Sequence, residues 1–186
     1  METSITEPTV AAAAAAIAPD APARGPFPEG VAWTLFAHAS ESEDWSEGSY
    51  ARVGTFRDFE SLWACLEVVG TEALLSSMWF FMRDPYPPLW ENALNIRGGS
   101  YCLRIGEAST RELMDRYMAA VVLGVAAVDP LNSIVGVTVS PKRQFHILKL
   151  WNTSARDFSS PSDVRSLSEV LNPNSIQYRR HVEQKM

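Results

Sequence analysis

The stretch from Trp79 to Tyr101 constrains the fold of this chain more than any other. Its first residues, Trp79 to Met82, are apolar and predict a strand, and the Pro-rich segment that follows cannot continue a sheet. A Gly-Gly pair then leads into another strand. Trp90 and Glu91 are therefore expected side by side on a loop, which indicates a binding surface. An equally simple alternative is that Trp90 closes the end of a sheet.

Composition limits the function classes that the chain can serve. Its 186 residues, 46% of them hydrophobic, suffice for one domain with a substantial core. The formal net charge of -6 argues against a protein that holds long nucleic acid through many phosphates, although a short basic pocket stays compatible. Only two cysteines and three histidines occur, without disulfide or metal-ligand spacing, so neither a metal nor a cofactor is expected.

The N-terminal residues differ in composition from the rest. Residues 1–26 contain an alanine run and several prolines, and they are expected to form a flexible tail before a domain at 27–186. The tail has no basic region followed by a long apolar one, so neither a signal peptide nor a membrane span is expected. A reducing, cytoplasmic location fits these features.

Hydrophobic periodicity predicts the order of the elements. Strands are expected at 32–38, 49–56, 78–82, 100–105, 134–139, 145–151 and 176–182, and helices at 58–69, 110–128 and 163–171. The first helix should stop at Gly70, and the second should be capped by Ser109 or Thr110 and end at Asp129-Pro130. Strands 78–82 and 100–105 are expected to pair, and strands 134–139 and 145–151 should form a hairpin with a basic tip.

These elements predict the α+β class, with an antiparallel sheet and helices gathered on one face. The other face, where the loop residues Trp45 and Trp90 could converge, would be free for a ligand. The common sequence motifs of catalysis are absent, including the Walker-type loop, Gly-x-Ser-x-Gly and His-Glu-x-x-His. A carboxylate pair assembled only by the fold stays possible, but a binding module is favoured over an enzyme.

Several motifs occur in a characteristic order: Trp33-Thr-Leu-Phe36, Trp45, Phe56 to Trp63, Pro88-Leu-Trp-Glu91, Arg97-Gly-Gly99, Asp115-Arg-Tyr117 and Gly136 through Trp151. In that order and nearly that spacing, residues 27 to 181 resemble the eukaryotic translation initiation factor 4E family, the messenger-RNA cap-binding proteins. The resemblance implies a curved sheet of about eight strands, with three helices on its convex face. It places a slot for the 7-methylguanosine cap on the concave face.

The resemblance implies roles for individual residues. Trp45 and Trp90 would sandwich the methylated base, which is a cation and gains both stacking and cation-π attraction. Glu91 would accept hydrogen bonds from the guanine edge. Trp151 would lie beside the methyl group, unless it is a core aromatic at the end of a strand. Candidates for the phosphates are Lys142 and Arg143, then Lys149 and Arg156. Ile147 replaces a lysine that the family pattern expects, which predicts a weaker hold on phosphate.

The resemblance also implies a partner surface on the helical face, where the family receives a helix of a scaffold protein. By position it would comprise Pro28, Phe59, Trp63 and Leu123. Met118, Ala119 and Ala120 depart from the larger or acidic residues of the family, which favours a variant scaffold.

The leading hypothesis is a divergent paralogue, monomeric and not an enzyme. It would bind capped messenger RNA and recruit it for translation through a scaffold of the initiation factor 4G type. The alternative is an interaction adaptor or translational repressor with the same fold and weak or no cap binding, favoured by Ala119, Ala120 and Ile147. A more distant alternative is an enzyme that processes nucleotides.

Overall fold

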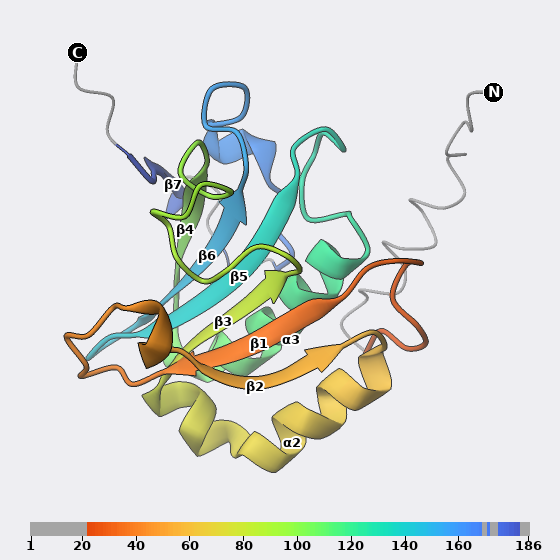
Figure 1. Cartoon of the computed structure of the whole chain (residues 1–186), viewed down its shortest axis with the longest axis vertical. Coiled ribbons are helices and arrows are strands. Elements are labelled where there is room, and N and C mark those ends of the chain that lie inside the picture. The colour runs from red at the N-terminus through yellow and green to blue at the C-terminus, as the bar shows by residue number, and fades with distance from the viewer. Residues whose placement is uncertain (1–21, 169–170, 172–174, 183–186) are drawn as a thin grey trace.

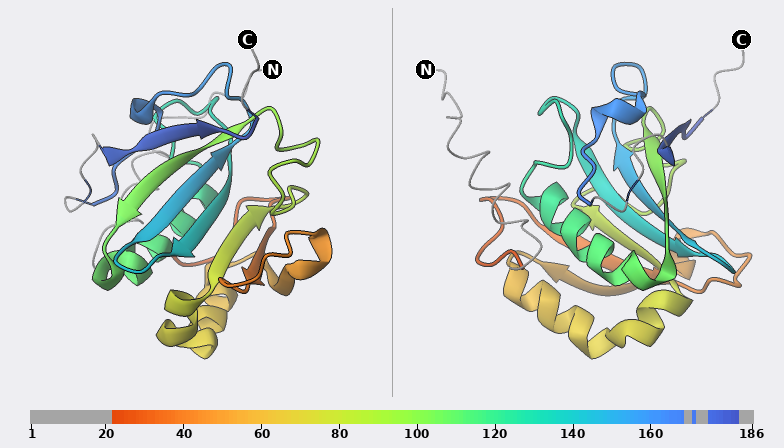
Figure 2. Two further views of the ribbon diagram at one scale, coloured as in Figure 1. Left: turned by 90° about the vertical axis from the view of Figure 1, so that its left-hand side faces the viewer. Right: turned by 180° about the vertical axis from the view of Figure 1, so that it is seen from behind.

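The structure, a computed structural model, describes residues 22–168, 171 and 175–182. One sheet joins its seven strands, all antiparallel to their neighbours, in the order β2-β1-β3-β5-β6-β4-β7 (Figure 1). The strands are β1 (Trp33–His38), β2 (Ala51–Phe56), β3 (Met78–Arg83), β4 (Gly99–Ile105), β5 (Ile134–Pro141), β6 (His146–Asn152) and β7 (Gln177–Arg180). The helices are α2 (Phe59–Ser76) and α3 (Thr110–Val122), with short 3₁₀ turns η1 (Glu47–Ser49), η2 (Glu107–Ser109) and η3 (Pro161–Asp163). Both α-helices cover the same face of the curved sheet (Figure 2).

The predicted fold class is confirmed, with smaller counts than expected. The described residues contain seven strands rather than about eight, and two α-helices rather than three. The helix predicted at 163–171 is wrong over its described part, since residues 164–168 are not helical and residues 169–170 lie outside the description. A capping box between Ser160 and Asp163 closes only the short turn η3. Val164 then forms a β-bridge with Ala127, so extended pairing replaces the helix.

The predicted pairing of β3 with β4 is also wrong. β3 pairs with β1 and β5, whereas β4 pairs with β6 and β7. The β5–β6 hairpin, which was predicted correctly, lies between them. The loop at 84–98 therefore connects two strands that are not neighbours in the sheet.

Helix α2 begins as expected, since the Asp58 side chain accepts a hydrogen bond of 2.7 Å from the backbone N–H of Ser61. Gly70 interrupts the helix with φ of 77°, but a second helical segment follows it to Ser76. Gly70 therefore ends the first helical segment, as predicted, and the second segment to Ser76 was not predicted.

Helix α3 begins at Thr110, as predicted, but it lacks the predicted side-chain cap and ends earlier than expected. It ends at Val122 because Gly124 adopts φ of 72°, and the N–H of Val125 donates to the carbonyl of Ala120 at 2.9 Å. Ser109 makes no capping hydrogen bond through its side chain, so the first predicted cap is wrong. Thr110 already lies inside the helix, and its hydroxyl donates to the carbonyl of Gly106 at 3.0 Å.

Alternation along the strands divides the apolar residues between two clusters. The larger cluster fills the space between sheet and helices and includes Trp33, Phe81 and Tyr117. The smaller one lies on the opposite, concave face. Its buried members are Phe80, Met82, Val135 and Trp151. The face left open by the helices is therefore floored by aromatic and apolar side chains.

Candidate functional site

Aromatic rings are connected across the floor of the concave face. Phe80 meets the ring of Tyr50 edge-on, with centroids 5.2 Å apart, and that of Trp151 at 6.4 Å. Phe36 and Met78 pack against the same cluster. Edge-to-face pairs of this kind stabilise a fixed arrangement of rings, so the floor is a preformed apolar surface.

Trp45 lies above this floor in the loop between β1 and β2 and is 47% exposed. Its indole stacks on the buried ring of His38, with centroids 4.4 Å apart and planes 6° apart. The His38 Nε2–H donates to the carbonyl of Asp44 at 2.8 Å. The Asp44 carboxylate accepts the N–H of Ser46 at 2.8 Å, and this bond lowers the pKa of Asp44. Hydrogen bonds of the two residues that flank Trp45, Asp44 and Ser46, thus hold its loop in place.

Trp90 is 51% exposed on the loop at 84–98, so it does not close the end of the sheet. The buried side-chain amide of Asn95 orders this loop by donating to the carbonyls of Pro87 and Leu89, both at 2.8 Å. His181 Nδ1–H donates to the carbonyl of Asn95 at 2.8 Å from the far end of the chain. The backbone is therefore fixed while the indole is left in solvent.

The loops that carry the two exposed tryptophans approach each other around Tyr50. The ring of Tyr50 lies 4.9 Å from that of His38, the ring beneath Trp45. Burial raises the pKa of Tyr50 to about 12, and the negative charge of Glu91 adds to the shift. Glu91, next to Trp90, is therefore close enough to Tyr50 to affect its ionisation.

Cations gather further along the same face. Lys149 lies between Thr138 and Cys102 in the strand register, and Arg179 of β7 lies two pairs further along β4, opposite Ser100. Burial lowers the pKa of Lys149, and the positive charges of Lys142 and Arg179 lower it further. None of these three cations forms an ion pair with a residue that the structure describes. We call Lys142, Lys149 and Arg179 the basic cluster.

The other predicted phosphate residues lie elsewhere on the surface. Arg143 is exposed at the tip of the β5–β6 hairpin, and Arg156 is exposed in the segment after β6. Arg179 was not predicted as a site residue. Alternation along the last strand puts Arg179 and Arg180 on opposite faces, but only the pairing of that strand with β4 shows that Arg179 lies on the face of Lys149.

Trp151 is 5% exposed and belongs to the floor. His181 tilts against it, with centroids 4.8 Å apart, and its indole N–H has no hydrogen-bond partner among the described residues. Trp151 thus resembles a core aromatic at a strand end, and its unpartnered N–H lies in the same cluster as the other rings.

The residues predicted for the partner surface fall into two groups. Phe59 is buried and Trp63 half-buried, and both contact the chain's own residues 22–27. Pro28 and Leu123 line a separate cavity of about 260 Å³, which Trp33 also lines. Met118, Ala119 and Ala120 are buried, so they form no exposed contact surface here.

A family model described as eukaryotic initiation factor 4E matches residues 30–186. The chain belongs to this family. Among curated relatives of the initiation factor 4E type, the NCBP protein of Arabidopsis thaliana is 26% identical over 121 residues, covering 64% of this chain and 54% of its own. Initiation factor 4E of Saccharomyces cerevisiae is 30% identical over 129 residues, covering 66% and 60%. The chain thus spans little more than half the length of these initiation factors.

Solved structures of initiation factor 4E share the fold. The complex of Ascaris suum eIF4E-3 with an m7G cap superposes with a TM-score of 0.58 at 20% identity, covering 72% of this chain and 77% of that one. Schistosome eIF4E complexed with m7GpppA and 4E-BP gives a TM-score of 0.60 at 20% identity, covering 71% and 74%. Within the described residues, no helix is long and apolar enough to cross a membrane, and no cluster of His, Cys, Asp and Glu could hold a metal.

Proposed function

We propose that this initiation factor 4E family member binds the 7-methylguanosine cap of messenger RNA on its concave face, between Trp45 and Trp90. One observation carries the proposal: of the six tryptophans, only these two are exposed, at 47% and 51%, and their loops approach each other around Tyr50. The cap complex of the Ascaris relative, which shares the fold, supports it.

The cap has three parts that the protein can recognise: the methylated ring, the hydrogen-bonding edge of the guanine and the phosphates. Each of them matches residues that are present. Methylation makes the guanine a cation, so indole faces attract it by stacking and by cation-π interaction, and stacking alone contributes roughly 1 to 3 kcal/mol per base. Glu91 accepts hydrogen bonds from N1–H and the 2-amino group of the base. The basic cluster meets the phosphates, because neighbouring cations that have no carboxylate partner among the described residues attract an anion. Arg143 and Arg156 contact the RNA beyond the first phosphates.

The protein recruits capped messenger RNA for translation by bridging it to a scaffold of the initiation factor 4G type or a variant of it. The partner docks on the helical face, away from the cap. Schistosome eIF4E has the same fold as this chain. Its complex with 4E-BP supports a partner site in addition to a cap site.

A titration of tryptophan fluorescence with 7-methyl-GTP and with GTP tests the proposal. We expect saturable quenching by the methylated nucleotide and far weaker binding of GTP. The Trp45→Ala and Trp90→Ala variants should each lose roughly fivefold to a hundredfold in affinity, with unchanged melting temperatures. Leu131→Ala, which removes another exposed apolar side chain, is the control. Wild-type affinity in Trp90→Ala would rule out the base sandwich.

A second candidate function is an adaptor or repressor with little cap affinity. Ile147 favours it, because this side chain lies on the concave face where the family pattern has a lysine. Equal quenching by 7-methyl-GTP and GTP, or none by either, would support the adaptor.

A further inference from the structure

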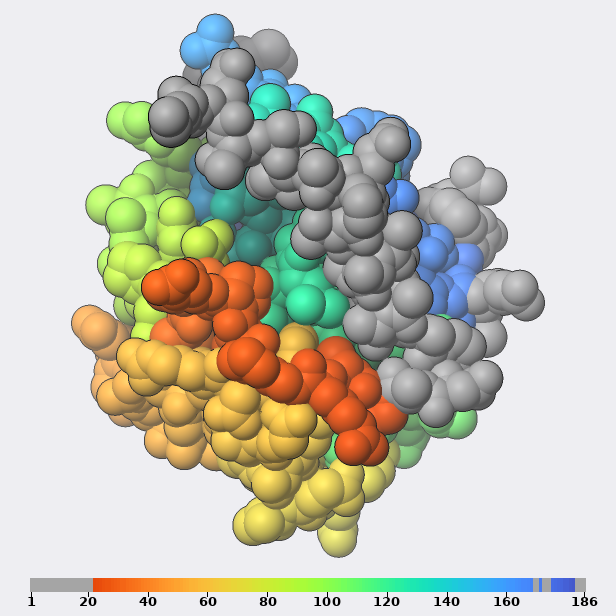
Figure 3. All heavy atoms as spheres, turned by 90° about the vertical axis from the view of Figure 1, so that its right-hand side faces the viewer, coloured from red at the N-terminus to blue at the C-terminus, as the bar shows by residue number. Residues whose placement is uncertain are grey.

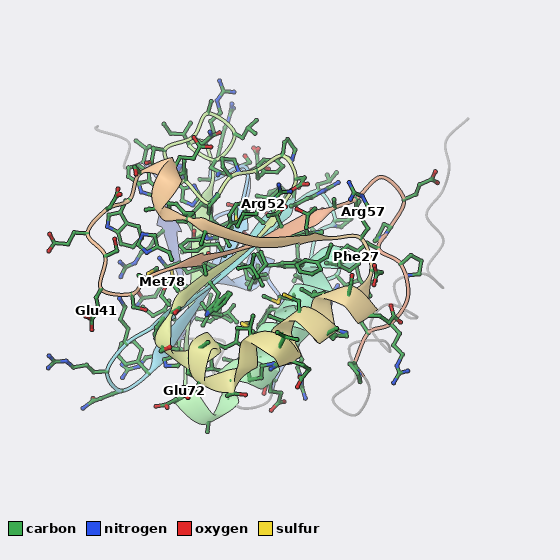
Figure 4. All side chains as sticks on the ribbon, turned by 60° about the horizontal axis from the view of Figure 1, so that its bottom comes forward. Phe27, Glu41, Arg52, Arg57, Glu72 and Met78 are labelled. Carbon is green, nitrogen blue, oxygen red and sulfur yellow. The ribbon has the colours of Figure 1, made fainter. Side chains whose placement is uncertain are left out.

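The first described residues, 22–27, cross the start of helix α2, and we call them the strap (Figure 3). Two main-chain hydrogen bonds attach the strap near Phe27, which Figure 4 places beside the start of that helix. The N–H of Phe27 donates to the carbonyl of Arg57 at 2.7 Å, and the N–H of Phe59 donates to the carbonyl of Gly25 at 3.0 Å. The ring of Phe27 also meets that of Phe59 edge-on, with centroids 4.9 Å apart. This end of the strap is part of the core.

The other end of the strap covers Trp63. The Trp63 indole N–H donates to the carbonyl of Ala23 at 2.8 Å, and the side chain of Ala23 is only 4% exposed. The N–H of Gly25 donates to the Glu60 carboxylate at 2.9 and 3.1 Å to its two oxygens. The strap therefore supplies one acceptor, one donor and one small apolar side chain to the face that the proposed function gives to a partner.

We propose that the strap is a built-in competitor for this face, so that a partner helix reaches Trp63 only after residues 22–24 have moved away. The inference rests on the partner part of the proposed function. An indole has a single N–H donor, so Ala23 and a partner carbonyl cannot both accept its hydrogen bond in the same place.

The two ends of the strap differ in how firmly they are held. Phe27 is 5% exposed and belongs to the main core, whereas Ala23 contributes one methyl group and one carbonyl. Gly25 lies between them with φ of 85°, a conformation that other residues adopt at a cost. Gly25 is thus the place where residues 22–24 can swing outward while Phe27 stays in the core.

The contacts of the strap also define the partner that can replace it. Such a chain offers a carbonyl to Trp63, an apolar side chain for the site of Ala23, and a donor to Glu60. A basic side chain suits Glu60 best, because charge-assisted hydrogen bonds are the stronger ones. The cavity beside Pro28 and Leu123 is not covered by the strap residues and can receive the partner's other apolar side chains.

Two substitutions in the full chain weaken the strap in different ways. Ala23→Arg places a charged side chain in a buried site, and the matched control Pro22→Arg adds the same charge at the exposed residue beside it. Gly25→Ala strains the backbone without a clash, because nothing lies within 4 Å of the added Cβ. In the open state, residues 22–24 have moved away from Trp63. We expect each strap variant to raise the ratio of open to closed molecules by roughly tenfold.

The first readout is hydrogen exchange of the Trp63 indole N–H by NMR, assigned with Trp63→Phe. It should be protected in the wild type and in Pro22→Arg, and it should exchange roughly tenfold faster in both strap variants. The second is affinity for the 4E-BP of the schistosome complex, which should rise up to tenfold in the strap variants only. Protection that survives in both strap variants would overturn the proposal, as would exposure without any gain in affinity. Quenching by 7-methyl-GTP in the same samples tests the cap site separately, so its failure is distinguishable from failure of the strap.

Discussion

The Trp45 indole lies flat on the imidazole of His38, 4.4 Å between centroids and 6° from parallel. His38 belongs to strand β1 and is 1% exposed, so a buried side chain of the sheet supports an exposed side chain of a loop. The site thereby holds one of its two proposed aromatic faces in a fixed orientation before any ligand arrives.

This support predicts a cost when His38 is replaced. In His38→Ala, the Trp45 loop loses both its stacking partner and the hydrogen bond to Asp44, so ordering the loop must occur on binding. Immobilising one side chain costs about 0.5 to 1.5 kcal/mol, so 7-methyl-GTP affinity should fall roughly twofold to tenfold. His38→Phe keeps the stacking and should fall less. Fluorescence titration measures both, and equal losses would show that the hydrogen bond alone matters.

The basic cluster predicts a ligand-dependent effect. Arg179→Ala should weaken 7-methyl-GTP binding about tenfold, the size expected for hydrogen bonds to charged groups, and should leave 7-methylguanosine binding unchanged. Arg180→Ala is the matched control, because its side chain alternates to the other face of the same strand. Added salt should reduce the difference between the variants. A similar loss for both ligands would place Arg179 outside the phosphate site.

Gly98 of the Arg-Gly-Gly motif should be intolerant of any side chain. A Cβ at this position would overlap the backbone carbonyl of Asn152, which cannot move without disturbing β6. Gly98→Ala should therefore destabilise the protein by about 1 to 3 kcal/mol or more, measured by urea denaturation. Gly106→Ala is the control, since its Cβ would meet nothing within 4 Å. Equal stability of the two variants would contradict the close approach.

Stability should fall as the pH drops below about 6.5. Burial lowers the pKa of His146, whose Nδ1 lies 2.9 Å from the hydroxyl of Thr110. The folded pKa is below the unfolded value of about 6.5, so at lower pH the unfolded state binds more protons and is stabilised relative to the folded state. His146→Gln should show a smaller difference between urea midpoints at about pH 7.5 and pH 5.5. Burial also lowers the pKa of His181, so some dependence should remain.

Local patterns in the sequence predicted most elements, because alternation and helical spacing are properties of neighbouring residues. Choices between competing signals were harder. Gly124 and Asp129-Pro130 both signal the end of a helix, and the earlier one decides because its turn lets the N–H groups of Gly124 and Val125 donate to the carbonyls of Val121 and Ala120. The order of strands was beyond local patterns, since the position of β4 depends on a hairpin that follows it in the chain.

The residues of the candidate site were predicted in part, because local patterns mark some of them and long-range pairing places the others. The exposure of Trp45 and Trp90 follows from their loops, and the motifs marked both residues. Arg179 depends on the register of a strand far away in sequence, which composition does not reveal. The burial of Ala23 against Trp63 was hidden because an alanine- and proline-rich segment has the composition of a tail.

The strand order has a consequence for the folding of the protein during its synthesis on the ribosome. When Ile105 has emerged, the nascent chain already carries both exposed tryptophans and Glu91, but the strands β5 and β6 that lie between β3 and β4 have not yet been made. The hairpin that ends at Asn152 must insert between them first. Such long-range pairing is slow compared with local folding. The concave face therefore takes shape only after Asn152 has been made, and a chain terminated before that residue carries the exposed tryptophans without the surface that positions them.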